Sequence, residues 1–260
     1  MDRLTWSAFA LCCAWCSATA SAQQLGYSYY GLMLPIVAET PSYASAIFVH
    51  NPGTSALAIT FTYQGATTSA SPGMTTCQTL QVPAGNVAKI SLGELCPLNA
   101  GANFGALLTG YSGSYFALYS RVETPSGNGF SIEGMTDSSC CGVIREVLGL
   151  RRQAAAPIYQ SNCFIHNEES RVGRIVVTLA SGTGQLIASQ IFDLASNEFI
   201  RLLDVFATLN APAGDYDNVR ASFESIVPVS GGSAIGFLAS CTVQNSTSFD
   251  ADFRVAKAHS

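Results

Sequence analysis

Hydrophobic and polar residues alternate along most of this chain with a period of two, which is the pattern of strands that bury one face. About seven such runs can be traced in each half of the sequence. Segments rich in Gly, Pro, Ser and Asn separate the runs, among them NPGTS, PAGN, SGTG and PAGD. These residues favour chain reversals because they accept the backbone conformations of turns. Only residues 91–95 and 201–209 favour short helical turns, so the pattern predicts an all-β protein.

The two halves of the chain repeat one another. The motif FVHN at 48–51 returns as FIHN at 164–167, and alternating apolar residues follow each copy. The segment TLQVPAGNVAKISL (79–92) then aligns without a gap with IFDLASNEFIRLLD (191–204). Each half has the length and strand content of two antiparallel sheets packed face to face. The repeat therefore predicts two tandem antiparallel β-sandwiches.

Later segments extend this alignment. GALLTG (105–110) aligns with RASFES (220–225), and YFALYSRV (115–122) aligns with IGFLASCT (235–242). The spacing between aligned residues changes slightly along the chain, as loop insertions between fixed strands would cause.

The predicted divisions of the chain are a signal peptide at 1–22, a first sandwich at 23–136, a linker at 137–155 and a second sandwich at 156–260.

We interpret the repeated F-x-H-N motif as the end of one strand, used at equivalent places. Its first two residues then point to opposite faces of a sheet. Asn51 and Asn167 open the following turn, where a short amide side chain can bond nearby backbone groups. His50 and His166 are interpreted as strand-end residues that face solvent or a domain seam. Neither has a second imidazole near it in sequence, and His259 is the only other histidine.

Turn and strand residues of the first half follow a fixed order along the chain. They are Phe48, Asn51, Pro52, Gly53, Val82, Pro83, Ala84, Gly85, Gly105, Ala106, Leu107, Ser120 and Arg121. In this order of residues the first half resembles Ig-like modules of secreted bacterial proteins. The second half follows the pattern more loosely, since Glu168 replaces the proline and LASN replaces V-P-A-G. The resemblance implies that both sandwiches are Ig-like and belong to a cell-envelope or extracellular protein. It implies no single activity, because function depends on sites rather than on the fold.

The first 22 residues have the features of a secretory signal peptide. Arg3 provides the positive start, an apolar run covers 6–15, and Ala20-Ser21-Ala22 matches a cleavage signature. The apolar run is shorter than the roughly 20 residues that a membrane-spanning helix needs. No later apolar stretch is long enough either. We therefore expect a secreted, periplasmic or cell-surface protein that is not an integral membrane protein.

Charged residues are scarce, at 11% of the chain, against roughly 25% in ordinary domains. Neither half has the basic excess needed to neutralise phosphates, so nucleic acid is not an expected partner. Eight of the ten tyrosines lie in the first half. This half should therefore present a neutral, hydroxyl-rich surface.

Six of the nine cysteines lie beyond the predicted signal peptide, and an even number in an exported chain predicts a disulfide framework. Cys77 and Cys96 occur together in the first half, where the aligned second half has no cysteine. Cys163 and Cys241 occur together in the second half, and their aligned positions are Ile47 and either Arg121 or Val122. Two cysteines that occur together in one repeat and have no counterparts in the other are expected to form a disulfide. This predicts the bonds Cys77–Cys96 and Cys163–Cys241. Cys140 and Cys141 then pair either with each other or with another chain.

The sequence contains no recognised motif for catalysis or cofactor binding. It has no G-x-S-x-G elbow, no P-loop and no H-E-x-x-H. The cysteines lack the spacing of a zinc site. Asp215 and Asp217 could offer carboxylates to Ca²⁺, but a polar turn explains them better. We therefore predict no catalytic, cofactor-binding or metal-binding residues.

These observations favour a secreted or envelope-associated binding or assembly protein that is not an enzyme. Its partner would be another protein or a second copy, joined through sandwich surfaces or exposed sheet edges. One alternative is a carbohydrate-binding module that uses the tyrosines, although the best aromatic platform, tryptophan, occurs only within the first 22 residues. A second alternative is a secreted hydrolase built on carboxylates from neighbouring strands or on His50.

Overall fold

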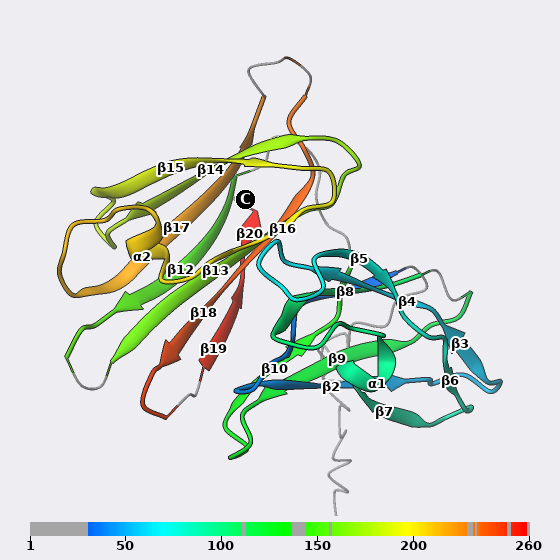
Figure 1. The fold of residues 1–260 in the computed structure, drawn as a ribbon. Coiled ribbons are helices and arrows are strands. Elements are labelled where there is room, and N and C mark those ends of the chain that lie inside the picture. Colours follow the sequence, from blue (N-terminus) through cyan, green and yellow to red (C-terminus); the bar gives the residue numbers. More distant parts are fainter. Residues whose placement is uncertain are drawn as a thin grey trace, which may run out of the picture.

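The computed structural model describes residues 31–110, 113–136, 144–155, 158–227, 231, 233–248 and 251–258. Its elements are almost all strands joined by short loops, and every pairing is antiparallel (Figure 1). The all-β prediction is therefore confirmed. The elements of the first half are β1 (Leu32–Glu39), β2 (Ala44–His50), β3 (Leu57–Ile59), β4 (Phe61–Gly65), β5 (Gly73–Thr76), β6 (Leu80–Val82), β7 (Val87–Ser91), α1 (Leu92–Leu95), β8 (Asn103–Thr109), β9 (Ala117–Glu123), β10 (Gly129–Glu133) and β11 (Met135–Thr136). Those of the second half are β12 (Ile144–Arg152), β13 (Tyr159–Asn167), β14 (Gly173–Ala180), β15 (Leu186–Leu194), β16 (Phe199–Leu202), α2 (Val205–Thr208), β17 (Tyr216–Ile226), β18 (Phe237–Asn245), β19 (Ala251–Val255) and β20 (Lys257–Ala258).

The large sheet of the first half folds over at the link between β1 and β2. These two strands share only the pair Glu39–Ala44. On one side of this corner, hydrogen bonding connects β5, β4, β8 and β1; on the other it connects β7, β2, β9 and β10. Ile47 of β2 and Leu107 of β8 belong to the same buried cluster. The corner therefore places two sheet layers around one core.

The second half repeats these pairings. One of its sheets has the order β15-β14-β17-β12-β20, and the other has the order β16-β13-β18-β19. These orders match β5-β4-β8-β1 and β7-β2-β9-β10 of the first half, and β20 pairs with β12 as β11 pairs with β1. A short helix follows β7 in one half and β16 in the other. The repeat read from the sequence is thus visible in strand pairing, while the Ig-like assignment stays a prediction.

Both expected helical turns form, and their first residues explain where they begin. Ser91 and Glu94 make a capping box at α1, in which each side chain satisfies a backbone N–H of the other residue. Asp204 caps α2 by accepting a hydrogen bond from the Ala207 N–H. Residues 201 and 202, expected to be helical, instead belong to β16. They pair with β13, whose ladder hydrogen bonds determine their conformation.

The structure corrects the sequence alignment of the strands that carry Cys241. Phe48 of β2 lies opposite Tyr119 of β9, and the equivalent Phe164 of β13 lies opposite Ser240 of β18. Cys241 therefore takes the place of Ser120, not of Arg121 or Val122. A shift of one residue exchanges the two faces of a strand. The corrected register directs Cys241 to the core, as its full burial requires.

The alignment of β8 with β17 also shifts by one residue. The core-facing positions are Asn103, Gly105, Leu107 and Thr109 in β8, and Val219, Ala221, Phe223 and Ser225 in β17. Leu107 pairs with Tyr63 of β4 as Phe223 pairs with Val177 of β14. The outward-facing residues of β8 therefore correspond to Arg220, Ser222 and Glu224 of β17.

The segment predicted as a linker, 137–155, contains a strand in its described part. Residues 144–152 form β12, which pairs with β17 along most of its length and with β20 at its start. Val147 and Leu150 of this strand lie in the core of the second half. This half therefore includes residues that precede position 156.

The two halves pack against each other through a seam, in which the sheet of β13 and β18 faces the first half (Figure 1). Phe104 of β8 stacks on Phe164 of β13, with ring centroids 5.3 Å apart. Phe164, Phe199 and Leu238 of the second half belong to the core cluster of the first. The Asn128 side chain also donates a hydrogen bond of 2.7 Å to the backbone oxygen of Ser248. Consequently β13 and β18 are buried on both faces along most of their length.

A search for membrane-spanning helices finds none of sufficient length and apolar character in the described ranges.

Candidate functional site

Asn51 directly follows β2, and its side chain bonds the turn that precedes β7. Its side chain is buried, and its Nδ2 donates to the backbone oxygens of Ser55 (2.8 Å), Val82 (3.0 Å) and Pro83 (3.2 Å). Its Oδ1 accepts from the Gly53 N–H at 2.9 Å. The predicted local bond is therefore confirmed, and the same amide also reaches a turn 31 residues later in the chain.

Asn167 makes three of the four equivalent contacts in the second half. Its Nδ2 donates to the backbone oxygens of Arg171 (2.8 Å) and Ala195 (2.7 Å), and its Oδ1 accepts from the Glu169 N–H at 3.0 Å. Ala195 is the residue that aligns with Pro83. The repeated motif is thus explained by structure: each copy holds a strand end against a turn of its own half.

The phenylalanine of each motif lies on the outer face of its sheet, but only one of the two outer faces is covered. Phe164 is buried in the seam, whereas Phe48 stacks on Tyr119 at the surface, with centroids 4.5 Å apart. The histidines differ in the same way. His166 is buried and lies at the seam, and His50 is partly exposed. Both are strand-end residues, as predicted, while His259 lies outside the described residues.

Two disulfides form, and they are the two pairs expected from the repeat. Cys77 and Cys96 are 19 residues apart and tie the end of β5 to the residue that follows α1. Cys163 and Cys241 are direct neighbours on the paired strands β13 and β18. Disulfides persist in oxidising compartments, so both bonds fit an extracellular setting. Cys140 and Cys141 lie outside the described residues.

The two aspartates considered for Ca²⁺ are engaged with the chain itself. Asp215 accepts a hydrogen bond of 2.9 Å from the Ala154 N–H. Asp217 lies 3.9 Å from the guanidinium of Arg151 and also accepts from the Asn218 N–H. Within the described ranges, no group of three or more His, Cys, Asp or Glu side chains is arranged to hold a metal ion. These carboxylates therefore act as turn and ion-pair residues.

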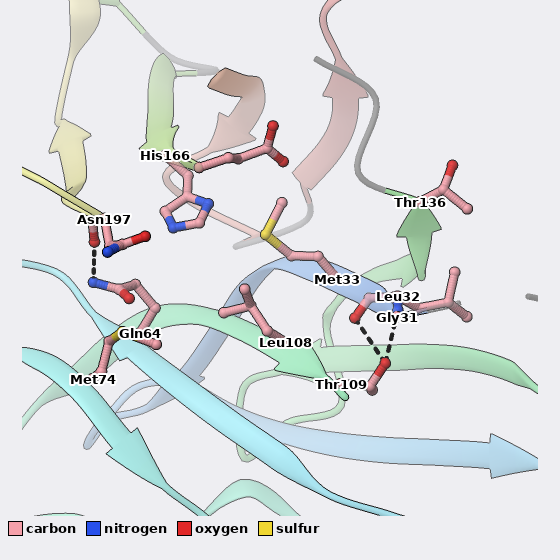
Figure 2. Close-up of a pocket in the computed structure, with 11 residues that line it drawn as sticks. Gly31, Leu32, Met33, Gln64, Met74, Leu108, Thr109, Thr136, His166 and Asn197 are labelled. Carbon is pink, nitrogen blue, oxygen red and sulfur yellow. Dashed lines mark hydrogen bonds between the residues drawn. The ribbon is translucent and has the colours of Figure 1, made fainter. Parts of the chain in front are cut away.

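A cleft of about 490 Å³ opens at one end of the seam (Figure 2). We call it the seam cleft. Met33, Leu108 and Gln64 line it from the first half, and His166, Glu168 and Asn197 line it from the second. The side chain of Gln64 reaches across and donates a hydrogen bond to the backbone oxygen of Asn197.

Two polar side chains of the seam cleft, Gln64 and Thr109, bond the backbone of the chain itself. The hydroxyl of Thr109 accepts from the Leu32 N–H at 2.7 Å and donates to the Leu32 oxygen at 3.1 Å, as Figure 2 shows. Both bonds keep this hydroxyl on the β1 backbone. The remaining surface of the cleft is largely apolar, from Met33, Leu108 and Met74. The cleft can hold a small ligand, but the Thr109 hydroxyl is engaged with the backbone and is not placed as a nucleophile.

Strand β15 is a long edge of the outer sheet of the second half. It pairs only with β14 and lies on the side away from the first half (Figure 1). Its nine residues, LIASQIFDL, contain no Pro, Gly or Lys, and Leu186 and Ile191 are 63% and 52% exposed. Asp193 is its single charge. The bond from Arg174 lowers the pKa of this carboxyl and keeps it ionised.

The equivalent edge of the first half is built differently. Strand β5 has only four residues, begins at Gly73 with a positive φ of 74°, and is followed directly by the disulfide-bonded Cys77. Short edges, charged side chains, proline and covering loops are the usual ways in which proteins prevent strands from pairing with other chains. Strand β15 has none of these protections beyond Asp193 at its end.

Sequence reasoning anticipated exposed edges in general but did not single out β15. The composition of an unprotected strand is visible in the sequence, because LIASQIFDL is a long β-forming run with a single charge. What the pattern could not provide is the position of the strand at the edge of its sheet, which depends on the sheet order. The seam residues were also missed, since contacts between the halves leave no periodic signature in sequence.

Comparison of the chain with protein-family models, with curated proteins and with solved structures finds no match.

Proposed function

We propose that this protein is an exported, non-enzymatic assembly protein that pairs with a second copy of itself through strand β15. The observation that carries the proposal is the unprotected length of this edge. Its outward backbone groups form a ready template for another strand, and strand addition of this kind is a common mode of association. The two disulfides support export because such bonds persist in oxidising compartments.

A second copy is the occupant that the composition of β15 favours. In an antiparallel pair centred on Gln190, Leu186 of one copy lies opposite Leu194 of the other, and Ala188 lies opposite Phe192. The single charge, Asp193, then lies opposite Ile187, so no like charges meet. Apolar cross-strand pairs stabilise such a ladder, whereas like charges placed opposite each other destabilise it.

The test is the mass of the native protein in solution, measured by sedimentation over a range of concentrations with and without reductant. We expect a dimer that persists in reductant and dissociates on dilution. The change Ile191→Lys should convert it to a monomer, because two lysines would face each other diagonally across the dyad. Val87→Lys is the matched control, since Val87 is 57% exposed but lies on β7 of the first half. It should leave the dimer intact.

Two results would contradict the proposal. One is a wild-type protein that is a monomer at every concentration. The other is an Ile191→Lys variant that dimerises as well as the wild type. A dimer that disappears with reductant would point instead to a disulfide between chains, for which Cys140 and Cys141 are the available residues.

A second candidate function, glycan binding, is favoured by one observation on the first half. Tyr119 is 39% exposed and stacks on Phe48, whose ring also lies 5.5 Å from the ammonium of Lys89. An exposed aromatic face of this kind can pack against the apolar side of a sugar ring. A glycan array probed with the wild type and with Tyr119→Ala tests it. Absence of signal, or signal unchanged by the substitution, would remove this candidate.

A further inference from the structure

Arg201 is a cation in the seam without an acidic partner. It lies on β16 opposite Phe164, and its guanidinium carbon lies 4.9 Å from the ring centroid of Phe104 in the first half. Burial lowers the pKa of this guanidinium. Arginine nevertheless remains protonated in proteins, so the seam contains a permanent positive charge.

Six other arginines of the second half are paired with acids: Arg151, Arg152, Arg171, Arg174, Arg220 and Arg254. Arg174 binds Asp193 at 2.6 Å, and Arg152 lies 3.8 Å from Asp204. Within the part of the chain that the structure describes, the half-buried Arg201 side chain makes no ion pair and no hydrogen bond; its contact is with the Phe104 ring. Taking a charge out of water costs free energy unless an opposite charge or hydrogen bonds compensate for it. The surroundings of Arg201 are therefore short of an anion.

A cavity of about 260 Å³ adjoins this guanidinium, at a place distinct from the seam cleft. We call it the Arg201 pocket. Its apolar walls come from both halves and include Ile36, Phe104 and Phe130 of the first half and Leu203 of the second. No Asp or Glu is among the residues that line it. The pocket thus combines an apolar interior with one positive charge.

A second hydrogen-bond donor lies in the same pocket. The Oδ1 of Asn162 accepts from the Asp204 N–H at 2.9 Å and from Gln160 Nε2 at 2.9 Å. These bonds orient the amide and leave its hydrogens for another acceptor. The hydroxyl of Tyr43 and the amide of Gln244 bind each other across the seam. Besides the Arg201 guanidinium and the Asn162 amide, the Tyr43 hydroxyl can still donate, because it accepts from Gln244, and the hydroxyls of Ser42 and Thr242 also line the pocket.

We propose that the Arg201 pocket binds a small monocarboxylate with an apolar ring. The carboxylate pairs with the planar guanidinium of Arg201, for which a two-point hydrogen-bonded geometry is preferred. The ring lies against the apolar walls, which both halves supply. Bound ligand therefore contacts both sides of the seam and adds to the cohesion of the two halves.

The experiment is a calorimetric titration of the whole protein with benzoate and with benzamide, which have the same shape but differ in charge. We expect benzoate to bind at least about ten-fold more tightly, because only its carboxylate can form a charge-assisted, hydrogen-bonded pair with the guanidinium. The change Arg201→Gln should remove this preference, and Arg201→Lys should keep part of it. The control variant is Arg220→Gln, since Arg220 is paired with Glu146 on an outer face and does not line the pocket.

The proposal is overturned if benzoate does not bind at millimolar concentration, or if benzoate and benzamide bind equally. It is also overturned if Arg201→Gln retains the preference for benzoate. Should Arg201→Gln fail to fold, the two ligands compared on the wild type still decide the matter. Chemical-shift changes on adding benzoate should include Tyr43 and Phe130 of the first half together with Asn162 and Leu203 of the second.

Discussion

Replacing Asn51 by alanine should destabilise the first half by about 2–4 kcal/mol. The side chain is 1% exposed, and its amide serves three backbone carbonyls and one backbone N–H. Alanine cannot replace any of these bonds. A typical hydrogen bond contributes about 1 kcal/mol, and each buried group left without a partner costs about 1–3 kcal/mol. Water can reach some of the freed carbonyls in the turn, which keeps the total below the full sum.

Asn51→Asp is a sharper version of the same experiment. The aspartate has the shape of asparagine, so one oxygen still accepts from the Gly53 N–H. Its other oxygen faces the carbonyls of Ser55 and Val82, where the amide nitrogen was a donor. An ionised carboxylate is disfavoured there, so its pKa in the folded protein should be raised above the unfolded value. The loss of folding stability relative to wild type is then larger at pH 7 than at acid pH, where the protonated carboxyl can again donate a hydrogen bond.

The assay is urea unfolding followed by far-ultraviolet circular dichroism and tyrosine fluorescence. Tyrosine is the fluorophore of the chain from residue 23 onward, because both tryptophans lie within the first 22 residues. Asn167→Ala should cost a similar amount in the second half, since its bonds are equivalent. Asn86→Ala is the control, because that amide is exposed and bonds only its own turn. A loss below about 0.5 kcal/mol for Asn51→Ala would refute the reasoning, since buried hydrogen-bonded groups cost more than this.

The remaining predictions concern the second half. Cys163→Ser should leave Cys241 as a thiol that can be alkylated after unfolding. The free energy of unfolding should fall by about 4 kcal/mol, as expected for the loss of a disulfide that closes a loop of this length. An unchanged melting temperature would contradict this prediction. The Arg171 side chain and the Gly236 N–H bond Glu169 and lower the pKa of its carboxyl from the ordinary 4.5. The stability contributed by Glu169 is therefore present above that pH and lost as pH falls through the lowered pKa. The difference between wild type and Glu169→Gln should be largest near neutral pH and vanish in acid, as measured by melting curves; a constant difference would show that the bond does not depend on charge.

Much of the fold could be predicted because strands and turns are encoded locally. The alternation of Ile47, Phe48 and Val49 identifies the faces of β2, and Asn51 marks its end. The disulfides could be predicted because a cysteine pair stands out against a repeat without one. These signals depend on neighbouring residues or on comparison of the two halves.

The register between strands and the contacts between halves could not be predicted in the same way. Cys241 was aligned one residue away from its true equivalent, because weakly similar strands can slide by one position without losing apolar matches. In sequence Arg201 looks like an exposed residue at the start of a helical turn. Its burial depends on the approach of Phe104, which lies almost a hundred residues earlier in the chain.

The seam joins unlike faces of the two repeats, and this limits how many repeats can be stacked. The β1–β8 side of the first half contacts the β13–β18 side of the second, so the same contact could in principle add a third unit at either end. On the outer face of the second half, however, Arg220 and Glu224 occupy the positions of Phe104 and Leu108, and Arg220 is paired with Glu146 at 3.3 Å. A polar outer face of this kind closes a repeat array as a capping unit does. The sequence of β17 thus closes the array at the outer face of the second half, and stacking of a further repeat on that face would require those charges to become apolar.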